Sequence, residues 1–307
     1  MKFSIVIPNY NGANFISDCL KSLQIALIGF DYEIIIVDNN STDNSLILAK
    51  KILPNFRVIL NKKNLGFAAA VNQGIMSAKY EYVVLVNNDI VVDNNWFKYL
   101  SKTIDYHKHA VTFCGAVLNK TGTHYESLGL KYFIRGKCLN IKNKRRFLPK
   151  THKKLITTQI WGSSAAIVIY KKEIIQKIGL FDSNYFAYEE DVDLALRLHN
   201  LGFITMLNPQ AISYHIGGAT SSKMGNFRNQ MDTKNWFYII IKNYSLKNII
   251  LNFIPITIER LRNLSGLIKS SSFPKIFCDI FYVYSQVLSN IPNMIKKRQQ
   301  IKKIAKL

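Results

Sequence analysis

The stretch YEIIIVDNNSTDNSLILAKK, residues 32–51, decides the fold class, because an apolar run typical of a buried strand leads through a polar turn into a helical pattern. The same alternation continues on both sides of it. Strand-like runs lie at residues 3–7, 57–60 and 82–86, and helical patterns lie at residues 14–27, 44–51 and 67–78. Strands separated by helices of this length predict βαβ units and a mostly parallel sheet. We therefore expect an α/β domain of the Rossmann-like, nucleotide-binding type.

The region from about residue 159 to residue 215 continues the α/β pattern. It predicts a strand at 160–170, helices at 172–178 and 189–200, and a strand near 203–207. Between the two halves, residues 119–158 lack a clear period and are expected to form a long basic insertion or a pair of loops. The whole α/β domain is expected to span residues 1–244.

Residues 245–307 change to the pattern of amphipathic helices. Apolar positions between Phe277 and Ile291 recur at spacings of three and four, and the chain ends with the basic run MIKKRQQIKKIAKL. No run of about 18 apolar residues is present in the sequence, so a membrane-spanning helix is not expected. We expect this tail to lie on an anionic membrane surface. The alternative is a helical subdomain that packs on the core and exposes its lysines to solvent.

The net charge of +22 is concentrated in two segments. Residues 131–154 hold ten Lys and Arg and no acid, and residues 245–307 hold eleven Lys and Arg against two acids, which gives +10 and +9. Two basic segments suit an anionic partner such as phospholipid or nucleic acid. The sequence carries no recognisable nucleic-acid-binding motif, so a nucleic-acid partner is not expected.

Four widely spaced cysteines, without a CxxC pair, argue against a zinc site and against a disulfide framework. They are expected to be buried thiols in a reducing compartment. The first residues run directly into a strand-like stretch and do not resemble a secretion signal. The protein is therefore expected in the cytoplasm, attached peripherally to the inner face of the cell membrane.

Polar side chains follow the predicted strands, at the edge of an open α/β sheet where ligands bind. Asp38 could accept a hydrogen bond from the imide N–H of uracil or thymine, or it could cap its turn, whereas Asp43 is better explained as a cap residue. In NKKNLGFAAAVNQGI, residues 61–75, a glycine turn precedes a helix of small residues, which would let an anionic ligand approach the helix end. Taken alone, a simple tight connection is the better explanation of that glycine.

Asp89 follows the apolar run at 82–86, with Asn87 and Asn88 between them. A carboxylate here could hold Mg²⁺ or Mn²⁺ against a diphosphate, because these cations prefer oxygen ligands, and the alternative is an ordinary Asx turn. His215, in ISYHIGGATSSK, follows a further strand, and a neutral imidazole can bind a metal or contact a phosphate. The segment rich in Gly, Ser and Thr after it is suited to a mobile lid.

Four acids stand at the start of the helix predicted at 189–200, namely Glu189, Glu190, Asp191 and Asp193. The helix dipole explains one or two of them. Repulsion among the others can raise the pKa of one carboxyl group and prepare it as a general base. Asp193 is better explained as the structural partner of Arg197, four residues later.

Taken together, these segments resemble the family 2 inverting glycosyltransferases, especially the rhamnosyl-, galactosyl- and mannosyl-type transferases of bacteria and archaea. The matching stretches follow the family's order and are SIVIPNYNG, EIIIVDNNSTDNS, NKKNLGFAAAVNQGI, YVVLVNNDIVVD, WGSSAAIVIYKKEIIQKIGLFD, FAYEEDVDLALRLHNLGF and SYHIGG. They span residues 4–218. The resemblance implies a GT-A-type fold, followed here by the amphipathic helical region.

The resemblance also implies roles for individual residues. The residues implied to bind the nucleotide sugar are Pro8, Tyr10, Asp38, Asn64, Gly66, Phe67 and Asn88. Trp161 and Gly162 are implied to shape the pocket for the sugar and the acceptor. Asp89, at the last position of a DxD-type motif, and His215 are implied to bind the metal and the diphosphate.

By the same resemblance, Asp191 of the Glu190–Asp191 pair deprotonates the acceptor hydroxyl in a single displacement that inverts the anomeric carbon. Glu190 is expected to orient the acceptor. Mg²⁺ or Mn²⁺ would stabilise the leaving nucleoside diphosphate. The first position of the DxD-type motif is Asn87 in this chain, which leaves fewer carboxylates for the metal. The absence of a QxxRW motif argues against a processive cellulose- or chitin-synthase activity.

The donor is expected to be a UDP-, dTDP- or GDP-sugar, and the acceptor a glycan or a polyprenyl-diphosphate-linked glycan. One alternative is a sugar-phosphate nucleotidyltransferase, although PNYNGANF stands where that enzyme needs a Gly-rich loop with a basic residue. The other is a basic nucleic-acid-binding protein without catalysis. Sugar transfer that depends on the donor separates these functions.

Overall fold

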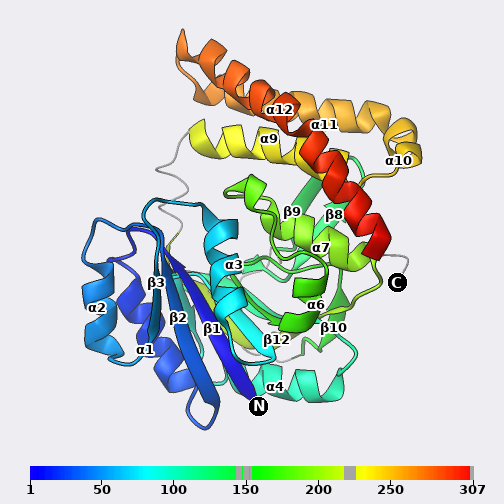
Figure 1. Ribbon diagram of the computed structural model, residues 1–307. Coiled ribbons are helices and arrows are strands. Elements are labelled where there is room, and N and C mark those ends of the chain that lie inside the picture. The colour runs from blue at the N-terminus through cyan, green and yellow to red at the C-terminus, as the bar shows by residue number, and fades with distance from the viewer. Residues whose placement is uncertain (143–146, 148–151, 153, 218–225, 305–307) are drawn as a thin grey trace.

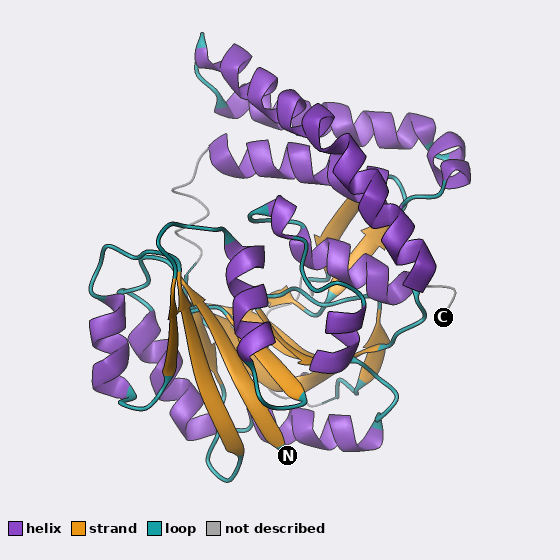
Figure 2. Ribbon diagram, viewed as in Figure 1, coloured by secondary structure: helices purple, strands orange, loops and turns teal. Residues whose placement is uncertain are grey.

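The computed structural model describes residues 1–142, 147, 152, 154–217 and 226–304. A central sheet carries helices on both of its faces, and a further group of helices covers one end of this body (Figures 1 and 2). The strands of the large sheet are β1 (Lys2–Asn9), β2 (Asp31–Asp38), β3 (Arg57–Leu60), β4 (Tyr82–Val86), β5 (Ile90–Val92), β6 (Thr112–Asn119), β7 (Tyr125–Ser127), β10 (Thr158–Ile160), β11 (Ile167–Lys171) and β12 (Thr205–His215). A small separate sheet consists of β8 (Leu130–Phe133) and β9 (Lys137–Asn140).

The helices of the α/β body connect these strands, and those of the C-terminal layer follow β12. The body contains α1 (Ile16–Ala26), α2 (Ser45–Ile52), α3 (Phe67–Ser77), α4 (Trp96–Tyr106), α6 (Lys172–Lys177), the short 3₁₀ helix η1 (Ser183–Tyr185) and α7 (Glu190–Asn200). The C-terminal layer contains α9 (Asn226–Asn243), α10 (Leu246–Leu251), α11 (Phe253–Ser270) and α12 (Lys275–Ile304).

The strand order of the large sheet is β10-β12-β6-β11-β4-β1-β2-β3, with β5 paired to β12 and β7 to β6. β1 pairs in parallel with both β2 and β4, and β2 pairs in parallel with β3. The carboxyl ends of these four strands therefore meet at one edge of the sheet. β6 and β12 are also parallel, whereas β11 runs antiparallel between β4 and β6. The α/β fold with a mostly parallel sheet, predicted from the sequence, is confirmed.

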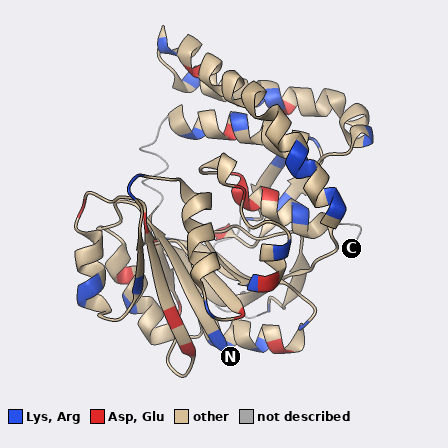
Figure 3. Ribbon diagram, viewed as in Figure 1, with Lys and Arg blue, Asp and Glu red and all other residues tan. Residues whose placement is uncertain are grey.

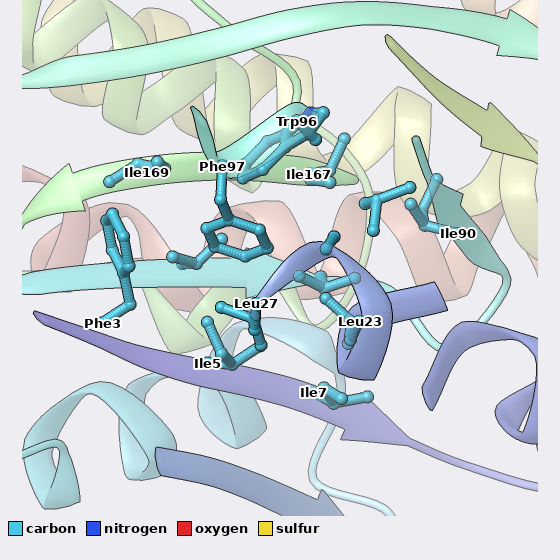
Figure 4. Packing of buried hydrophobic residues seen from close by; sticks show 14 of the residues in the cluster. Phe3, Ile5, Ile7, Leu23, Leu27, Ile90, Trp96, Phe97, Ile167 and Ile169 are labelled. Carbon is cyan, nitrogen blue, oxygen red and sulfur yellow. The ribbon is translucent and has the colours of Figure 1, made fainter. Parts of the chain in front are cut away.

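The strands are almost wholly apolar because helices bury both of their faces. In β1, the fully buried Phe3, Ile5 and Ile7 pack toward α1 and α4, while Val6, which alternates with them, packs toward α3 (Figure 4). The ring of Phe3 lies 5.3 Å from that of Phe97 on α4. Each such side chain contributes about 1.5–3 kcal/mol when fully buried. This core fixes the strand ends that carry the site.

The C-terminal layer packs on the body through one face and exposes the other. Trp236 and Tyr238 of α9 share a buried apolar cluster with Val287 and Met294 of α12 and with Val192 of α7. The outer faces of α10, α11 and α12 leave many large apolar side chains exposed to solvent. Among the described residues, no helix combines the length and the apolar character that a membrane-spanning segment requires.

Three expectations from the sequence are corrected here. Residues 119–158 form more than a loop pair, because β7 adds to the large sheet and β8 and β9 form a hairpin around the turn at Gly136. The strand expected at 160–170 is broken into β10 and β11. The strand near 203–207 and the strand before His215 are one long strand, β12, whose register shifts between Asn208 and Ile212. Pro209, which has no N–H for the ladder, lies within this shift.

The cysteines are all free thiols. Cys19 and Cys114 are buried, as predicted, and burial raises the pKa of the Cys114 thiol to about 12. Cys138 is half-buried and Cys278 is exposed, so the expectation of burial is wrong for Cys278. The exposure of Cys278 follows from its place on the outer face of α12, which the sequence pattern alone does not show.

Candidate active site

A cavity of about 410 Å³ opens at the carboxyl ends of β1 and β4. The residues that line it are Pro8–Gly12, Phe15, Asn39, Asn64, Gly66, Phe67, Asn87–Asp89, Ser164–Ala166, Phe186–Tyr188, Glu190, Asp191, His215 and Phe227. They come from segments far apart in the sequence, which the parallel strands bring to one edge. The prediction that the polar strand ends gather at a ligand-binding edge agrees with this arrangement.

The strand ends are joined by a chain of side-chain hydrogen bonds. Asn88 Nδ2 donates to Asn9 Oδ1 at 2.8 Å, and Asn9 Nδ2 donates to Asp38 Oδ1 at 2.8 Å and to Ser45 Oγ at 2.9 Å. Asn9 and Asp38 are 1% and 3% exposed, so these contacts are fully desolvated. The amide of Asn9 thus links the ends of β1, β2 and β4 and holds the cavity floor in place.

Asp38 is not among the residues that line the cavity, and its contact with a nucleoside stays a prediction. Its Oδ1 also accepts from Ser41 Oγ at 2.6 Å, and its Oδ2 accepts from the Ser41 backbone N–H at 2.9 Å. The carboxylate therefore acts in its own turn, which is the alternative that the sequence left open. Its neighbour Asn39 lines the cavity and donates to the Gly66 carbonyl at 3.1 Å. Nothing in the sequence pattern singled out Asn39.

The turn before α3 brings Asn64, Gly66 and Phe67 to the cavity, as predicted. Gly66 has φ +85°, and a Cβ at this position would lie 2.5 Å from the Phe186 carbonyl oxygen. Asn64 Oδ1 accepts from the Gly66 N–H at 2.9 Å, and the Phe67 N–H donates to the Phe186 carbonyl at 2.6 Å. The glycine is thus required by the close approach of two backbone segments, beyond the tight connection itself.

Pro8 and Tyr10 line the same cavity beside this turn. Tyr10 is 44% exposed, so its ring is free to contact a ligand at the mouth. Asp43, in contrast, accepts hydrogen bonds from the backbone N–H groups of Ala13 and Ser45. This agrees with the structural role that the sequence indicates for Asp43.

Asp89 and His215 meet at one side of the cavity, as predicted. His215 Nε2 lies 3.0 Å from Asp89 Oδ2, and its Nδ1 lies 2.8 Å from Glu126 Oε2 on β7. The hydrogen bonds from Asp89 and then Glu126 raise the pKa of His215 to about 10 against the opposing effect of burial. The imidazole is therefore a cation held between two carboxylates when no metal is bound. Glu126 lay in the segment without a clear period, so the sequence did not indicate it.

The side-chain oxygen atoms around Asp89 suit a divalent cation that a bound diphosphate would also coordinate. Within the described residues, no group of three or more His, Cys, Asp or Glu side chains is arranged to hold a metal by itself. However, Asp89 Oδ1 and Asn87 Oδ1 are buried and have no hydrogen-bond partner in the described part of the chain. Mg²⁺ is commonly bound by one or two carboxylates together with phosphates and water. Two free oxygen atoms beside His215 fit such a site.

Glu190 and Asp191 lie in the cavity at the start of α7 (Figure 3 shows the acidic cluster there). Burial and the neighbouring Asp191 raise the pKa of Glu190 to about 8. Burial also raises the pKa of Asp191, but its Oδ2 accepts from the Ala165 N–H at 3.2 Å and its Oδ1 from the Val192 N–H at 2.8 Å. Glu190 Oε2 has no partner among the described residues. The two backbone N–H groups that donate to Asp191 favour its charged form, and Glu190 Oε2 lacks such donors.

Trp161 and Gly162 are not among the residues that line this cavity, and their role in shaping the sugar and acceptor pocket stays a prediction. Trp161 stacks on Tyr132 of β8, with ring centroids 4.8 Å apart and an interplanar angle of 7°. Gly162 bridges to Leu130, and a Cβ there would lie 2.6 Å from the Ala195 side chain. Both residues instead fix the β8–β9 hairpin against α7. The predicted lid after His215 falls on residues 218–225, which lie outside the described residues.

A buried ion network anchors α7 from its other side. Arg197 pairs with Asp193 at 3.0 Å, as predicted, and Lys242 of α9 lies 2.7 Å from both Asp193 Oδ1 and Asp182 Oδ2. Lys297 of α12 also pairs with Asp182. Asp193, Arg197 and Lys242 are at most 3% exposed. The network joins α7 to α9 and α12 of the C-terminal layer, and the sequence pattern gave no sign of this connection.

An open α/β sheet with a cavity at the carboxyl edge of its parallel strands places the chain among the α/β folds that bind ligands at that edge. Residues 4–179 match the family model described as Glycosyl transferase family 2, and the chain belongs to this family. The predicted GT-A-type fold is confirmed by the solved structures that it resembles.

Relatives of this chain include synthases of a polysaccharide. The poly-beta-1,6-N-acetyl-D-glucosamine synthase of Staphylococcus aureus (strain MSSA476) is 28% identical over 218 residues, which cover 69% of this chain and 49% of the relative. The synthase of the same name from Staphylococcus epidermidis is 24% identical over 217 residues, with the same coverage of 69% and 49%. The chain thus spans about half the length of the curated relatives it matches.

Two solved structures share the fold at low sequence identity. Residues 1–349 of S. aureus TarS give a TM-score of 0.54 at 16% identity, covering 98% of this chain and 92% of that one. GalNAc-T7 with UDP, GalNAc and Mn²⁺ gives a TM-score of 0.59 at 15% identity, covering 92% of this chain and 57% of that one. At these identities the likeness establishes the fold alone.

Proposed function

We propose that the protein transfers a sugar from a nucleoside-diphosphate donor to a glycan hydroxyl, with inversion at the anomeric carbon, in the synthesis of a cell-envelope polysaccharide. The observation that carries the proposal is the Glu190–Asp191 pair, which presents one carboxylate inside a cavity at the nucleotide-binding edge. TarS has been solved with UDP and with UDP-GlcNAc, which supports a uridine-diphosphate sugar among the UDP-, dTDP- and GDP-linked donors. The names of the curated relatives support a glycan acceptor.

In this mechanism, Asp191 accepts the proton of the acceptor hydroxyl as that oxygen attacks the anomeric carbon. The new C–O bond forms while the bond to the donor phosphate oxygen breaks, and its electron pair leaves with the nucleoside diphosphate. Raised by burial, the pKa of Asp191 makes it a stronger base than an exposed aspartate. The protonated Glu190 beside it donates a hydrogen bond and so orients the acceptor. Binding of donor and acceptor in one cavity further increases the rate, because the reacting groups are held close together.

A divalent cation, Mg²⁺ or Mn²⁺, would be held by Asp89 and His215 and would neutralise the charge of the leaving diphosphate. His215 has to give up its proton to act as a ligand, which its two carboxylate partners oppose. Asp89 Oδ1 is the protein oxygen that is free without any rearrangement. The Mn²⁺ in the GalNAc-T7 structure supports this assignment by analogy of fold.

The exposed face of the C-terminal layer supports a peripheral place on the inner face of the cell membrane. The large apolar side chains of α10, α11 and α12 that are more than half exposed are Leu246, Ile250, Leu251, Phe253, Ile254, Leu261, Phe277, Phe281 and Leu288. The exposed Lys247, Arg262, Lys269 and Lys275 lie on the same helices. Each basic residue near an anionic bilayer contributes about 1 kcal/mol. A polyprenyl-diphosphate-linked glycan at that membrane would then be within reach as acceptor.

Vesicle binding tests this placement. The full chain should sediment with vesicles that contain phosphatidylglycerol, and salt should weaken this binding without abolishing it, because salt screens charges but not an inserted apolar face. Phe277→Ser with Phe281→Ser should lose the salt-resistant part while keeping the circular dichroism of the parent chain. Equal binding to neutral vesicles and complete release by salt would both contradict the proposal.

Family membership removes the nucleotidyltransferase and the non-catalytic nucleic-acid-binding protein as alternatives. The decisive experiment incubates the full chain with UDP-, dTDP- and GDP-sugars in turn, with Mn²⁺, and measures release of the nucleoside diphosphate. One group of donors should be hydrolysed slowly and should transfer its sugar when an acceptor is added, with the β/α configuration of the product read by NMR. Retention of configuration would exclude the single displacement, and release of pyrophosphate would exclude glycosyl transfer.

A further inference from the structure

The loop of residues 185–189, which leads into α7, has an unusual backbone conformation. Phe186, Tyr188 and Glu189 have φ values of +63°, +68° and +63°, in the region that favours glycine. Phe186, with ψ −64°, is also the centre of a γ-turn, because the N–H group after it donates to the carbonyl before it at 2.7 Å. A residue other than glycine adopts such angles at a cost in free energy, and they persist where surrounding contacts impose them. Contacts from outside the loop are therefore required to hold it.

The side-chain amide of Asn235 on α9 makes such contacts. Asn235 is completely buried, and its Nδ2 donates to the carbonyl oxygens of three loop residues. These are Tyr185 at 3.2 Å, Ala187 at 2.9 Å and Tyr188 at 2.7 Å. Three carbonyl groups therefore share the two N–H groups of one amide. The opposite orientation of this amide would turn Oδ1 toward the three carbonyl oxygens, and an acceptor would repel them.

The loop connects two walls of the cavity in the candidate active site, and its residues 186–188 line that cavity. The Phe186 carbonyl accepts from the Phe67 N–H at 2.6 Å, so the loop is joined to the turn before α3. The other end of the loop continues directly into Glu190 and Asp191 at the start of α7. A shift of the loop would therefore change the position of this acidic pair relative to the turn before α3.

We infer that Asn235 is a positioning residue, which holds the loop of residues 185–189 in its strained form and thereby places the acidic pair against the bound donor. The inference rests on the proposed glycosyl transfer. The cavity floor is held separately, by the hydrogen bonds of Asn9 with Asp38 and Asn88. Loss of the Asn235 amide should therefore lower turnover more than it weakens nucleotide binding. A misplacement of about 1 Å can lower a rate about 100-fold.

The test is Asn235→Leu in the full chain, which keeps a branched side chain and removes its N–H groups. With the UDP-, dTDP- or GDP-sugar that the parent chain hydrolyses fastest, turnover should fall at least about tenfold. The Kd of the matching nucleoside diphosphate with Mn²⁺, measured by calorimetry, should change less than about threefold, because the cavity floor is intact. Hydrogen–deuterium exchange should become faster in the peptides that contain Phe67 and Ala187, whose N–H groups donate to the loop, and should stay unchanged in β1 and β2.

Asn229→Leu is the matched control. It removes a side-chain amide of the same helix, which donates to the Gly266 carbonyl of α11 at 3.3 Å. Asn229 does not line the cavity and has no hydrogen bond to the loop among the described residues. Turnover, nucleotide affinity and the exchange of the two peptides should therefore match those of the parent chain.

Turnover of Asn235→Leu within twofold of the parent chain would overturn the inference, and so would equal losses of turnover and nucleotide affinity. Exchange that rises evenly over the whole chain would overturn it as well, because it marks a general loss of stability. If Asn235→Leu does not fold, Asn235→Ser, which keeps one O–H donor, decides by the same measurements with a smaller loss of turnover. Failure of the proposed function has a different signature, since the parent chain itself would then release no nucleoside diphosphate from any donor. The exchange at Phe67 and Ala187 is measured without a donor and does not depend on turnover.

Discussion

Replacing Lys242 with methionine removes the central cation of the buried network and should destabilise the whole protein. Its Nζ lies 2.7 Å from a carboxylate oxygen of both Asp182 and Asp193, and its side chain is 2% exposed. The methionine side chain has nearly the volume of lysine, so this substitution removes the positive charge and leaves the packing almost unchanged. Asp193 would still form its ion pair with Arg197, and Asp182 would still form its ion pair with the partly exposed Lys297. Breaking a buried pair costs about 3–5 kcal/mol, a large share of the 5–15 kcal/mol that stabilises a typical domain.

Urea unfolding followed by tryptophan fluorescence measures this loss. Lys297→Met, whose side chain is 29% exposed, should cost on the order of 1 kcal/mol, and Lys177→Met, in a surface pair, about 0.5 kcal/mol or less. The double variant Lys242→Met with Asp182→Asn should recover part of the loss, because it removes a carboxylate that the first change left unpaired. A cost for Lys242→Met no larger than that of Lys177→Met would refute the reasoning.

The same network sets the response to acid. Burial alone would raise the pKa of Asp182, but the charges of Lys242 and Lys297 hold it well below the ordinary value of 3.8, and Lys242 and Arg197 likewise lower that of Asp193. A carboxyl group whose pKa is lower in the folded than in the unfolded protein stabilises the fold at a pH above its unfolded-state pKa. This stability is lost as the pH falls through its folded-state pKa. The parent chain should therefore lose stability steeply below about pH 4, and Lys242→Met should lose less over that range.

Four further changes test the site. Asp191→Asn should lower turnover about 100-fold or more while nucleotide binding persists, whereas Glu190→Gln should be milder; near-normal turnover of Asp191→Asn would remove it as the base. Asp89→Ala should weaken nucleoside-diphosphate binding measured with Mn²⁺ by calorimetry, and full activity in excess chelator would contradict the metal proposal. Gly66→Ala should destabilise the chain by about 1 kcal/mol or more and weaken nucleotide binding, because its Cβ meets the Phe186 carbonyl at φ +85°.

The parts of the fold that the sequence predicts are those in which the pattern is local. Each βαβ unit repeats an apolar run, a polar turn and a helical stripe, so β1 to β4 and α1 to α3 fall within a few residues of their expected places. The gathering of Asn9, Asp89 and His215 follows from the parallel order of the strands. The resemblance to a family then supplied roles that spacing alone left open, as at Asp191.

The parts that escape prediction depend on contacts between segments far apart in the chain. Trp161 stacks on Tyr132 of the β8–β9 hairpin, a contact that the spacing of neither residue indicates. Glu126 stands in a short strand without a clear period, and it becomes a partner of His215 only because β7 joins β6. Asp38 carries the right chemistry for a nucleoside, but Asn9 and Ser41 occupy its oxygens. A single sequence contains no local signal for any of these pairings.

Helix α7 connects the proposed catalytic residues Glu190 and Asp191 to the C-terminal layer. Asp191 faces the cavity, and Asp193, two residues later and therefore about 200° around the helix, accepts from Tyr185 Oη and Asn243 Nδ2 and pairs with Arg197 and Lys242. Rotation of α7 that moved Asp191 would have to break contacts with α9, and through Asp182 those with α12. The packing of α12 against Asp182 therefore helps to hold α7, in addition to the membrane contact that we propose for residues 245–307. A change on the tail that loosens Lys297 or Met294 should accordingly alter turnover before it alters nucleotide binding.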